Sequence, residues 1–174
     1  MVSLQLNIVR YNPLKASSFI ELPEAIKNKQ ACINVENNDD DKCFLWAVLS
    51  AEKNIQKNPQ RVTHYTPFED TLNMDGIPTP VPITSIPRFE RLNNRSVNVY
   101  VLRWNRSLKK HDVDPVYISD VKQPQHVNLL YISNEKGSHY VWIKDMSRLI
   151  RGQSTHHHGK HFICDRCLHA SVSQ

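Results

Sequence analysis

The sequence predicts an α+β fold in which helices near the N-terminus pack on an antiparallel sheet. One apolar run, CFLWAVLSAEKN, has the composition of a helix whose first half is buried. Four short β-rich runs follow one another from Ser96 onward. With 174 residues, 40% of them hydrophobic, the chain is long enough for one globular domain with a core.

The first elements alternate between helix and strand. Ser17–Gln30 has serines and a proline near its start, followed by helix-forming residues, and predicts a first helix. Ala31–Val35 is short, alternating and β-branched, and predicts a strand. Cys43–Asn54 predicts the partly buried helix, and the aspartates just before it are N-cap candidates.

Prolines are frequent between Ile55 and Pro87, which indicates short helices and extended connections over the core. The sheet is predicted from SVNVYVLRW, DPVYIS, HVNLLYIS and HYVWIK. The turn-rich NEKG separates the last two runs, so Val127–Ile143 is predicted to be a hairpin. DMSRLI can then form one helical turn with Asp145 as its cap.

We expect one domain over residues 1–150, followed by a linker and a truncated zinc-finger-like tail over residues 151–174. The tail contains CDRC, whose two-residue spacing is that of half a zinc site, and His161 or His169 could add nitrogen ligands. Because half a site is weak evidence, we predict no bound metal.

Composition limits the functional classes. Four cysteines are too few and too unevenly spaced for a disulfide framework, which leaves metal binding or catalysis as their informative uses. The chain does not start like a signal peptide and has no apolar run of the roughly 20 residues that span a bilayer. We therefore expect an intracellular protein, in cytoplasm or nucleus, with no membrane partner.

The net charge of +5 permits contact with nucleic acid without demonstrating it, because solvated surfaces often have such a charge. Trp46, Trp104 and Trp142 are spread over three elements, and we expect them to be core or sheet-packing aromatics. The basic clusters are Arg88–Arg95, Arg103–His111 and Arg148–Gly152.

Cys43 is the first candidate for a catalytic residue. A helix N-terminus lowers the pKa of a thiol, and Cys43 opens the predicted buried helix. The alternative is an ordinary core cysteine. His139 begins the last predicted strand and is a candidate general base, or else a structural histidine. Gln30 ends the first predicted helix, and its amide could donate to an oxyanion.

This order of cysteine helix, histidine strand and upstream glutamine is that of papain-like cysteine proteases. KCFLWAVLSA with SHYVWIKD resembles the nucleophile and histidine motifs of intracellular deubiquitinases. ACINVENNDDDKCFLWAVL, HVNLLYIS, SHYVWIKDMSRLI and KHFICDRCL are similar to the region ahead of the polymerase in protein-primed B-family DNA polymerase polyproteins of animal transposable elements. That likeness spans Ala31 to Leu168. A domain of this kind also resembles the viral-tegument-like deubiquitinases, through Gln30, Cys43 and their spacing.

The resemblance implies a papain-like fold and a cysteine-type deubiquitinase. Such an enzyme would cleave isopeptide or peptide bonds after ubiquitin or a ubiquitin-like modifier through a thioester acyl-enzyme. It would need neither a metal nor an organic cofactor. Ubiquitin's C-terminal tail carries arginines, so Asp39, Asp40 and Asp41 beside Cys43 could bind it, or else form a solvated loop.

The third member of the triad stays open. The related enzymes place an acidic residue two positions before or after the histidine, where this chain has Gly137 and Val141. Asp145 is the nearest downstream carboxylate, but six extended residues span about 20 Å, so it can serve only if the strand bends. Its alternative role is that of a helix N-cap. The rivals are Asn128, Asp120 and Asp114.

A different class of function is also possible. The chain could be a non-enzymatic nucleic-acid-binding or scaffolding module ahead of a mobile-element DNA polymerase, using its basic clusters and a terminal zinc finger. In that case Cys43 should be buried, and its sulfur should lie far from any imidazole.

Overall fold

The computed structural model describes residues 19–135, 137–153 and 161–172. It has an α+β fold around a five-stranded sheet with the strand order β1-β5-β4-β2-β3. The strands of this sheet are β1 (Cys32–Ile33), β2 (Ser96–Asn105), β3 (Lys110–Tyr117), β4 (His126–Asn134) and β5 (Gly137–Ile143). The α-helices are α1 (Glu24–Lys27), α2 (Cys43–Lys53), α3 (Ile86–Asn93) and α4 (Met146–Leu149).

Three short 3-10 helices, η1 (Val62–His64), η2 (Thr66–Thr71) and η3 (Ile83–Ser85), lie in the proline-rich connection between α2 and α3. This confirms the short helices expected there. Near the C-terminus, β6 (His161–Ile163) and β7 (Ala170–Val172) form a separate hairpin. No helix in the part of the chain that the structure describes is both long and apolar enough to cross a membrane.

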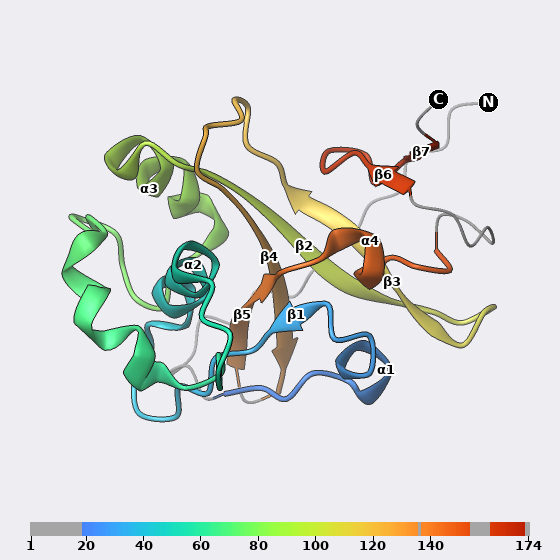
Figure 1. The fold of residues 1–174 in the computed structure, drawn as a ribbon, viewed down its shortest axis with the longest axis horizontal. Coiled ribbons are helices and arrows are strands. Elements are labelled where there is room, and N and C mark those ends of the chain that lie inside the picture. The colour runs from blue at the N-terminus through green and yellow to red at the C-terminus, as the bar shows by residue number, and fades with distance from the viewer. Residues whose placement is uncertain (1–18, 136, 154–160, 173–174) are drawn as a thin grey trace.

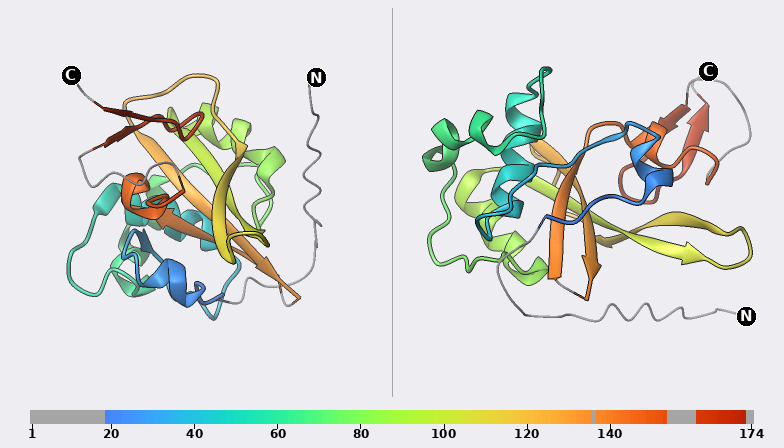
Figure 2. Two further views of the ribbon diagram at one scale, coloured as in Figure 1. Left: turned by 90° about the vertical axis from the view of Figure 1, so that its right-hand side faces the viewer. Right: turned by 90° about the horizontal axis from the view of Figure 1, so that it is seen from below.

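Elements cover both faces of the sheet (Figures 1 and 2). The helices α2 and α3 lie on one face, and α1, α4 and the β6–β7 hairpin lie on the other. Each face therefore has its own hydrophobic core. The first core contains α2, Phe89 and Tyr140, and the second contains Ile26, Val141 and Leu149.

The sheet is mixed, so the prediction of an antiparallel sheet was wrong in one pairing. β2 and β4 run parallel, with Ser96 opposite His126, whereas the β2–β3 and β4–β5 pairs are antiparallel. The cause is the connection from β3 to β4, which crosses the start of β2. The backbone N–H of Ser96 donates to Gln125 O at 3.0 Å, and the backbone N–H of Gln123 donates to Ser96 Oγ at 3.0 Å. The chain therefore enters β4 from the same end as β2.

Helix α2 begins at Cys43, as predicted, and its residues from Cys43 to Ser50 are all buried. Burial extends around the whole helix because the sheet covers one side and the segment from η1 to α3 covers the other. Phe44 connects the layers, with its ring 4.9 Å from that of Phe89 and 5.2 Å from that of Tyr140. The helix ends where Asn54 adopts a left-handed conformation with φ of 43°.

Two other predictions need correction. The first helix covers Glu24–Lys27 only, because Pro23, with φ of −51° and ψ of 139°, is not helical, and Ser17 lies outside the described residues. Trp104 is not a core residue, since 53% of its surface is exposed, while Trp46 is buried as expected. The hairpin of β4 with β5 and the cap of α4 by Asp145 are confirmed, because Asp145 Oδ1 accepts from the Arg148 N–H at 2.9 Å.

The outer edge of β3 is closed by a side chain. Gln153 Oε1 accepts from the Val113 N–H at 2.7 Å, and Gln153 Nε2 donates to Val113 O at 2.8 Å. A side-chain amide thus makes the two bonds that a neighbouring strand would make. Two residues later, Pro115 has no N–H to offer.

The packing around Phe44 gives the first prediction. Phe44→Ala should lower the free energy of unfolding by about 3–5 kcal/mol, because it leaves a cavity beside two aromatic rings. Phe44→Leu should cost clearly less because it keeps most of the volume. Denaturant unfolding would measure both changes, and equal losses for the two variants would contradict the packing described.

Candidate functional site

Cys43 lies where the sequence places it, at the first residue of α2, and 2% of its surface is exposed. The residue before the helix is Lys42, and no side chain caps the helix N-terminus. Asp40 instead accepts from the Lys42 N–H at 2.9 Å and from the Trp46 indole N–H at 3.0 Å. Asp40 therefore fixes the turn that leads into α2.

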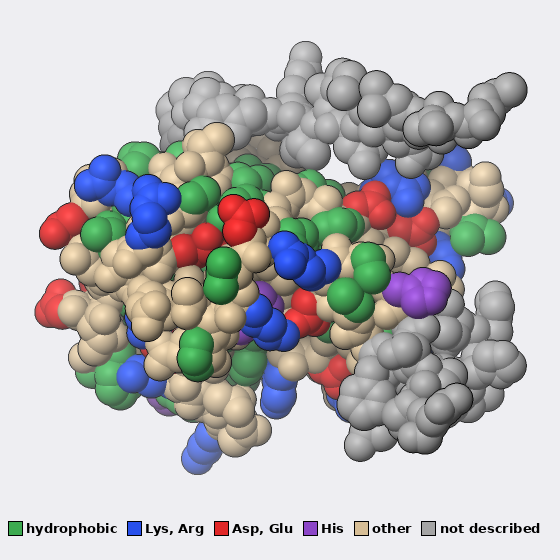
Figure 3. Space-filling model, turned by 90° about the horizontal axis from the view of Figure 1, so that it is seen from above, with side chains coloured by type: hydrophobic (Ala, Val, Ile, Leu, Met, Phe, Trp, Pro, Cys, Tyr) green, Lys and Arg blue, Asp and Glu red, His purple; other side chains and the backbone are tan. Residues whose placement is uncertain are grey.

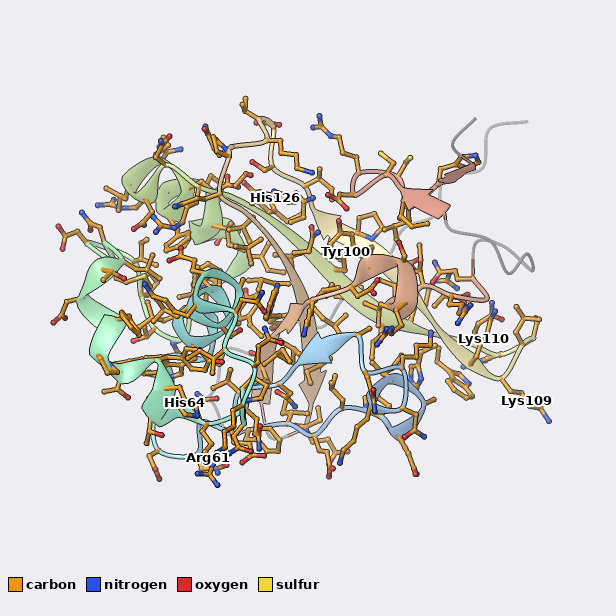
Figure 4. All side chains as sticks on the ribbon, in the orientation of Figure 1. Arg61, His64, Tyr100, Lys109, Lys110 and His126 are labelled. Atoms are coloured by element: carbon orange, nitrogen blue, oxygen red, sulfur yellow. The ribbon has the colours of Figure 1, made fainter. Side chains whose placement is uncertain are left out.

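The loop proposed for substrate binding is partly accessible. Asp39 is exposed, whereas Asp40 and Asp41 are half-buried. Asp39, Asp40 and Arg61 line a hollow of about 380 Å³. Figure 4 shows Arg61 near His64, far from the β2–β3 hairpin. A guanidinium at this hollow makes it less favourable for an arginine-bearing ligand than the acidic run alone would predict.

His139 lies in β5 and is fully buried. Its Nε2 is 2.8 Å from Asn34 Oδ1, and Asn34 Nδ2 donates to Ile20 O at 2.9 Å. Since an amide oxygen can only accept, the neutral imidazole carries its proton on Nε2. The Nδ1 lone pair has no hydrogen-bond partner among the described residues. Burial lowers the pKa of His139 to about 4.

The structure places Cys43 and His139 on opposite faces of the sheet. Tyr140 contacts Phe44 and belongs to the core around α2, whereas Val141 belongs to the core on the other face. Because successive side chains of a strand point to opposite faces, His139 shares the face of Val141. The two predicted catalytic residues are therefore not brought together.

Gln30 is also separated from Cys43. It is exposed, it follows α1 with a left-handed φ of 50°, and α1 lies across the sheet from α2. Asp145 caps the N-terminus of α4, which is the alternative to a catalytic role that the sequence left open.

The partner of His139 is Asn34, which the sequence analysis missed. Asn34 lies two residues from Cys32, whose side chain packs against the second core, so the alternation of the strand could have placed it there.

The rivals for the third catalytic position have other contacts. Asn128 Oδ1 accepts from Tyr100 OH at 3.3 Å, Asp114 forms an ion pair with Arg103, and Asp120 is exposed. The structure shows none of the three in contact with His139 among the described residues.

A second group of polar residues has the composition of a serine hydrolase triad. Ser96 Oγ is 2.7 Å from His126 Nδ1, and His126 Nε2 is 3.7 Å from Asp165 Oδ2. Ser96 is fully buried, however, so no substrate can reach it. Tyr100 OH donates to Asp165 O beside this group, and both Tyr100 and His126 are labelled in Figure 4. The group therefore attaches the β6–β7 hairpin to the sheet.

Cys164 and Cys167 lie in the turn between β6 and β7, and both are exposed. Hydrogen bonds from the backbone of Cys167 and Arg166 lower the pKa of the Cys164 thiol. Among the residues with described positions, no three His, Cys, Asp or Glu side chains form a group that could hold a metal. The side chain of His161 lies outside the described ones.

Exposed basic and apolar side chains lie together at the tip of the β2–β3 hairpin. This hairpin extends from the body of the molecule (Figure 1), and Figure 4 shows Lys109 and Lys110 at its end. Leu108 is 60% exposed and Trp104 is 53% exposed. Within the described parts of the chain, no carboxylate forms an ion pair with Arg106, Lys109 or Lys110. We call Trp104, Arg106, Lys109 and Lys110 the hairpin tip.

The loop of the hairpin tip is held in one shape by Asn105. Its Oδ1 accepts from the Leu108 N–H at 3.1 Å, and its Nδ2 donates to Asp112 Oδ2 at 2.7 Å. Lys109 adopts a left-handed φ of 48°, which closes the loop. These hydrogen bonds thus define the backbone conformation of the loop from which the exposed side chains extend.

Positive charge gathers on the side of the hairpin that faces α1. Burial lowers the pKa of Lys29, and the charge of Lys110 lowers it further. Lys110 Nζ in turn donates to Gly152 O at 2.6 Å. On the face of the molecule seen in Figure 3, basic and acidic side chains are interspersed. Lys29 and Lys110 lie close enough for the charge of one to lower the pKa of the other.

No protein-family model, no curated protein and no solved structure matches the chain. The arrangement of its own residues therefore carries the functional argument.

The buried imidazole gives a prediction about pH. His139 has a folded-state pKa of about 4, below the 6.5 of an unperturbed histidine, so the unfolded chain binds the proton more tightly. Its contribution to stability is complete above pH 6.5 and is lost as pH falls toward 4. The loss should be roughly 3 kcal/mol.

The measurement is urea unfolding at several pH values between 7 and 4 for the wild type and for His139→Gln. The variant should lose less stability across this window because its side chain does not titrate. Parallel curves for the two proteins would show that His139 does not carry the effect.

Proposed function

We propose that this chain is a nucleic-acid-binding module whose hairpin tip contacts the sugar-phosphate backbone. The observation that carries the proposal is the projecting hairpin, on which Arg106, Lys109 and Lys110 have no carboxylate partner among the described residues. Cations that no carboxylate neutralises attract phosphates, and each phosphate contact releases condensed counterions.

The protein as a whole is consistent with this proposal. Its net charge of +5 favours association with a polyanion, and the long-range field speeds the encounter. Of the arginines and lysines beyond the hairpin tip, several are neutralised by carboxylates, as in the pairs Arg95–Glu52, Lys42–Glu69 and Lys122–Asp165. Other cations, such as Lys57 and Arg91, also lack an ion pair among the described residues, and the hairpin tip differs from them in that it brings unpaired cations together with exposed apolar side chains.

Salt dependence tests this proposal. The double variant Arg106→Ala/Lys109→Ala should bind DNA more weakly and should reduce the slope of log affinity against log salt by about 1.4–1.8, because two phosphate contacts are lost. Fluorescence anisotropy with labelled oligonucleotides would measure both quantities. The matched control is Lys57→Ala, which removes an exposed lysine after α2.

Binding by the wild type with a slope that the double variant leaves unchanged would refute the role of the hairpin. A slope reduced equally by Lys57→Ala would show that net charge, and not this site, determines binding.

A thiol protease for ubiquitin or a ubiquitin-like modifier is the second candidate. Two observations favour it, namely Cys43 at the first residue of a helix packed on a sheet and an imidazole whose Nε2 is bonded to an amide oxygen. A papain-like domain would use both features, with Nδ1 toward the sulfur. For this to happen, His139 would have to reach the sheet face that α2 covers. The hairpin tip plays no part in this candidate function, so the nucleic-acid-binding proposal and the protease proposal can be tested independently.

Reaction with a modifier probe distinguishes this candidate. Ubiquitin and ubiquitin-like probes that carry a C-terminal thiol-reactive group should form a covalent adduct with the wild type but not with Cys43→Ala. Intact-mass measurement would detect the adduct. A folded sample that forms no adduct with any probe would exclude the protease, and adducts on both proteins would place the reactive thiol elsewhere, for example at the exposed Cys164 or Cys167.

A further inference from the structure

Trp104 is the most unusual side chain of the hairpin tip. Just over half of its surface is exposed, although burying a side chain of this size is favourable by about 25 cal/mol for each Å² of apolar surface. Its cross-strand neighbour His111 braces it, with ring centroids 5.0 Å apart and planes inclined by 67°. The indole is thus held in place by its edge contact while much of its surface stays open to a ligand.

A groove adjoins this indole. It has a volume of about 1040 Å³, at the upper end of the range of pockets that hold small organic ligands. Its two carboxylates are neutralised, because Glu21 accepts from Lys27 Nζ at 2.7 Å and Asp114 pairs with Arg103. The groove therefore does not repel an anion. Part of its wall is apolar or aromatic, formed by Ile20, Pro23, Leu102, Trp104, His111 and Ile132.

We propose that the ligand of the hairpin tip is a single-stranded nucleic acid and that one of its bases stacks on Trp104 at the groove. This inference rests on the proposed function and deepens it. Cations at the loop bind phosphates, and a half-exposed indole beside a partly apolar groove can stack on the flat surface of a base. Trp104 is the last residue but one of β2 and Lys109 lies in the loop that follows, so one strand that passes along the hairpin would meet both.

A duplex cannot use Trp104 in this way. Its bases are paired and stacked, and extruding one costs a few kcal/mol, whereas bases of a single strand are already available. The phosphates of a duplex can still contact Arg106 and Lys109. The structure therefore predicts a preference for single strands that depends on the indole and not on the cations.

The test uses the whole chain with a labelled single-stranded oligonucleotide and with the same sequence as a duplex. Trp104→Ala should weaken single-strand binding by about 5- to 150-fold and leave duplex binding nearly unchanged. Trp104→Phe should recover part of the loss. The matched control is Leu108→Ala, which removes an exposed apolar side chain of the same hairpin without removing an aromatic ring.

The outcomes separate this inference from the proposed function. Equal binding of single strand and duplex, unaffected by Trp104→Ala but weakened by Arg106→Ala/Lys109→Ala, would overturn the stacking and leave the phosphate contacts standing. Equal losses for Trp104→Ala and Leu108→Ala would also overturn stacking, since any apolar surface would then serve. Absence of binding to both nucleic acids would overturn the proposed function itself. Because Trp104 is exposed, the variant should fold, and circular dichroism would check this.

Discussion

The alternation of side chains along β5 is the constraint on which the rest of the structure depends. Tyr140 packs against Phe44 and joins α2 to the sheet, while Val141 supports the core under α1 and α4. A single strand thus divides the protein into two cores. Shifting its register by one residue would exchange the two sets of side chains, so the packing of either core fixes the other.

The same alternation explains why the predicted catalytic pair does not form. A cysteine at a helix start and a histidine in a distant strand can be recognised from composition and order alone. Whether they meet depends on which face of β5 the histidine occupies, and a shift of one position along the strand would change that face. In the structure the α2 face is occupied by Tyr140, and His139 bonds to Asn34 beneath the N-terminal segment at Ile20.

Local patterns predicted most of the elements, because each depends on residues close in sequence. The apolar run from Cys43 predicted α2, and the four β-rich runs predicted β2 to β5. The parallel pairing of β2 with β4 could not be predicted in this way, because it depends on the path of the connection over Ser96. The exposure of Trp104 was missed for a similar reason, since a strand that extends beyond the sheet has no core to cover its far end.

The closure of the β3 edge by Gln153 has a consequence for the protein at high concentration. An unpaired edge strand recruits a strand from another copy of the chain, which leads to aggregation. Here the amide of Gln153 already occupies the N–H and the carbonyl of Val113, and Pro115 offers no donor further along. Copies of the protein are therefore discouraged from adding to one another along this strand.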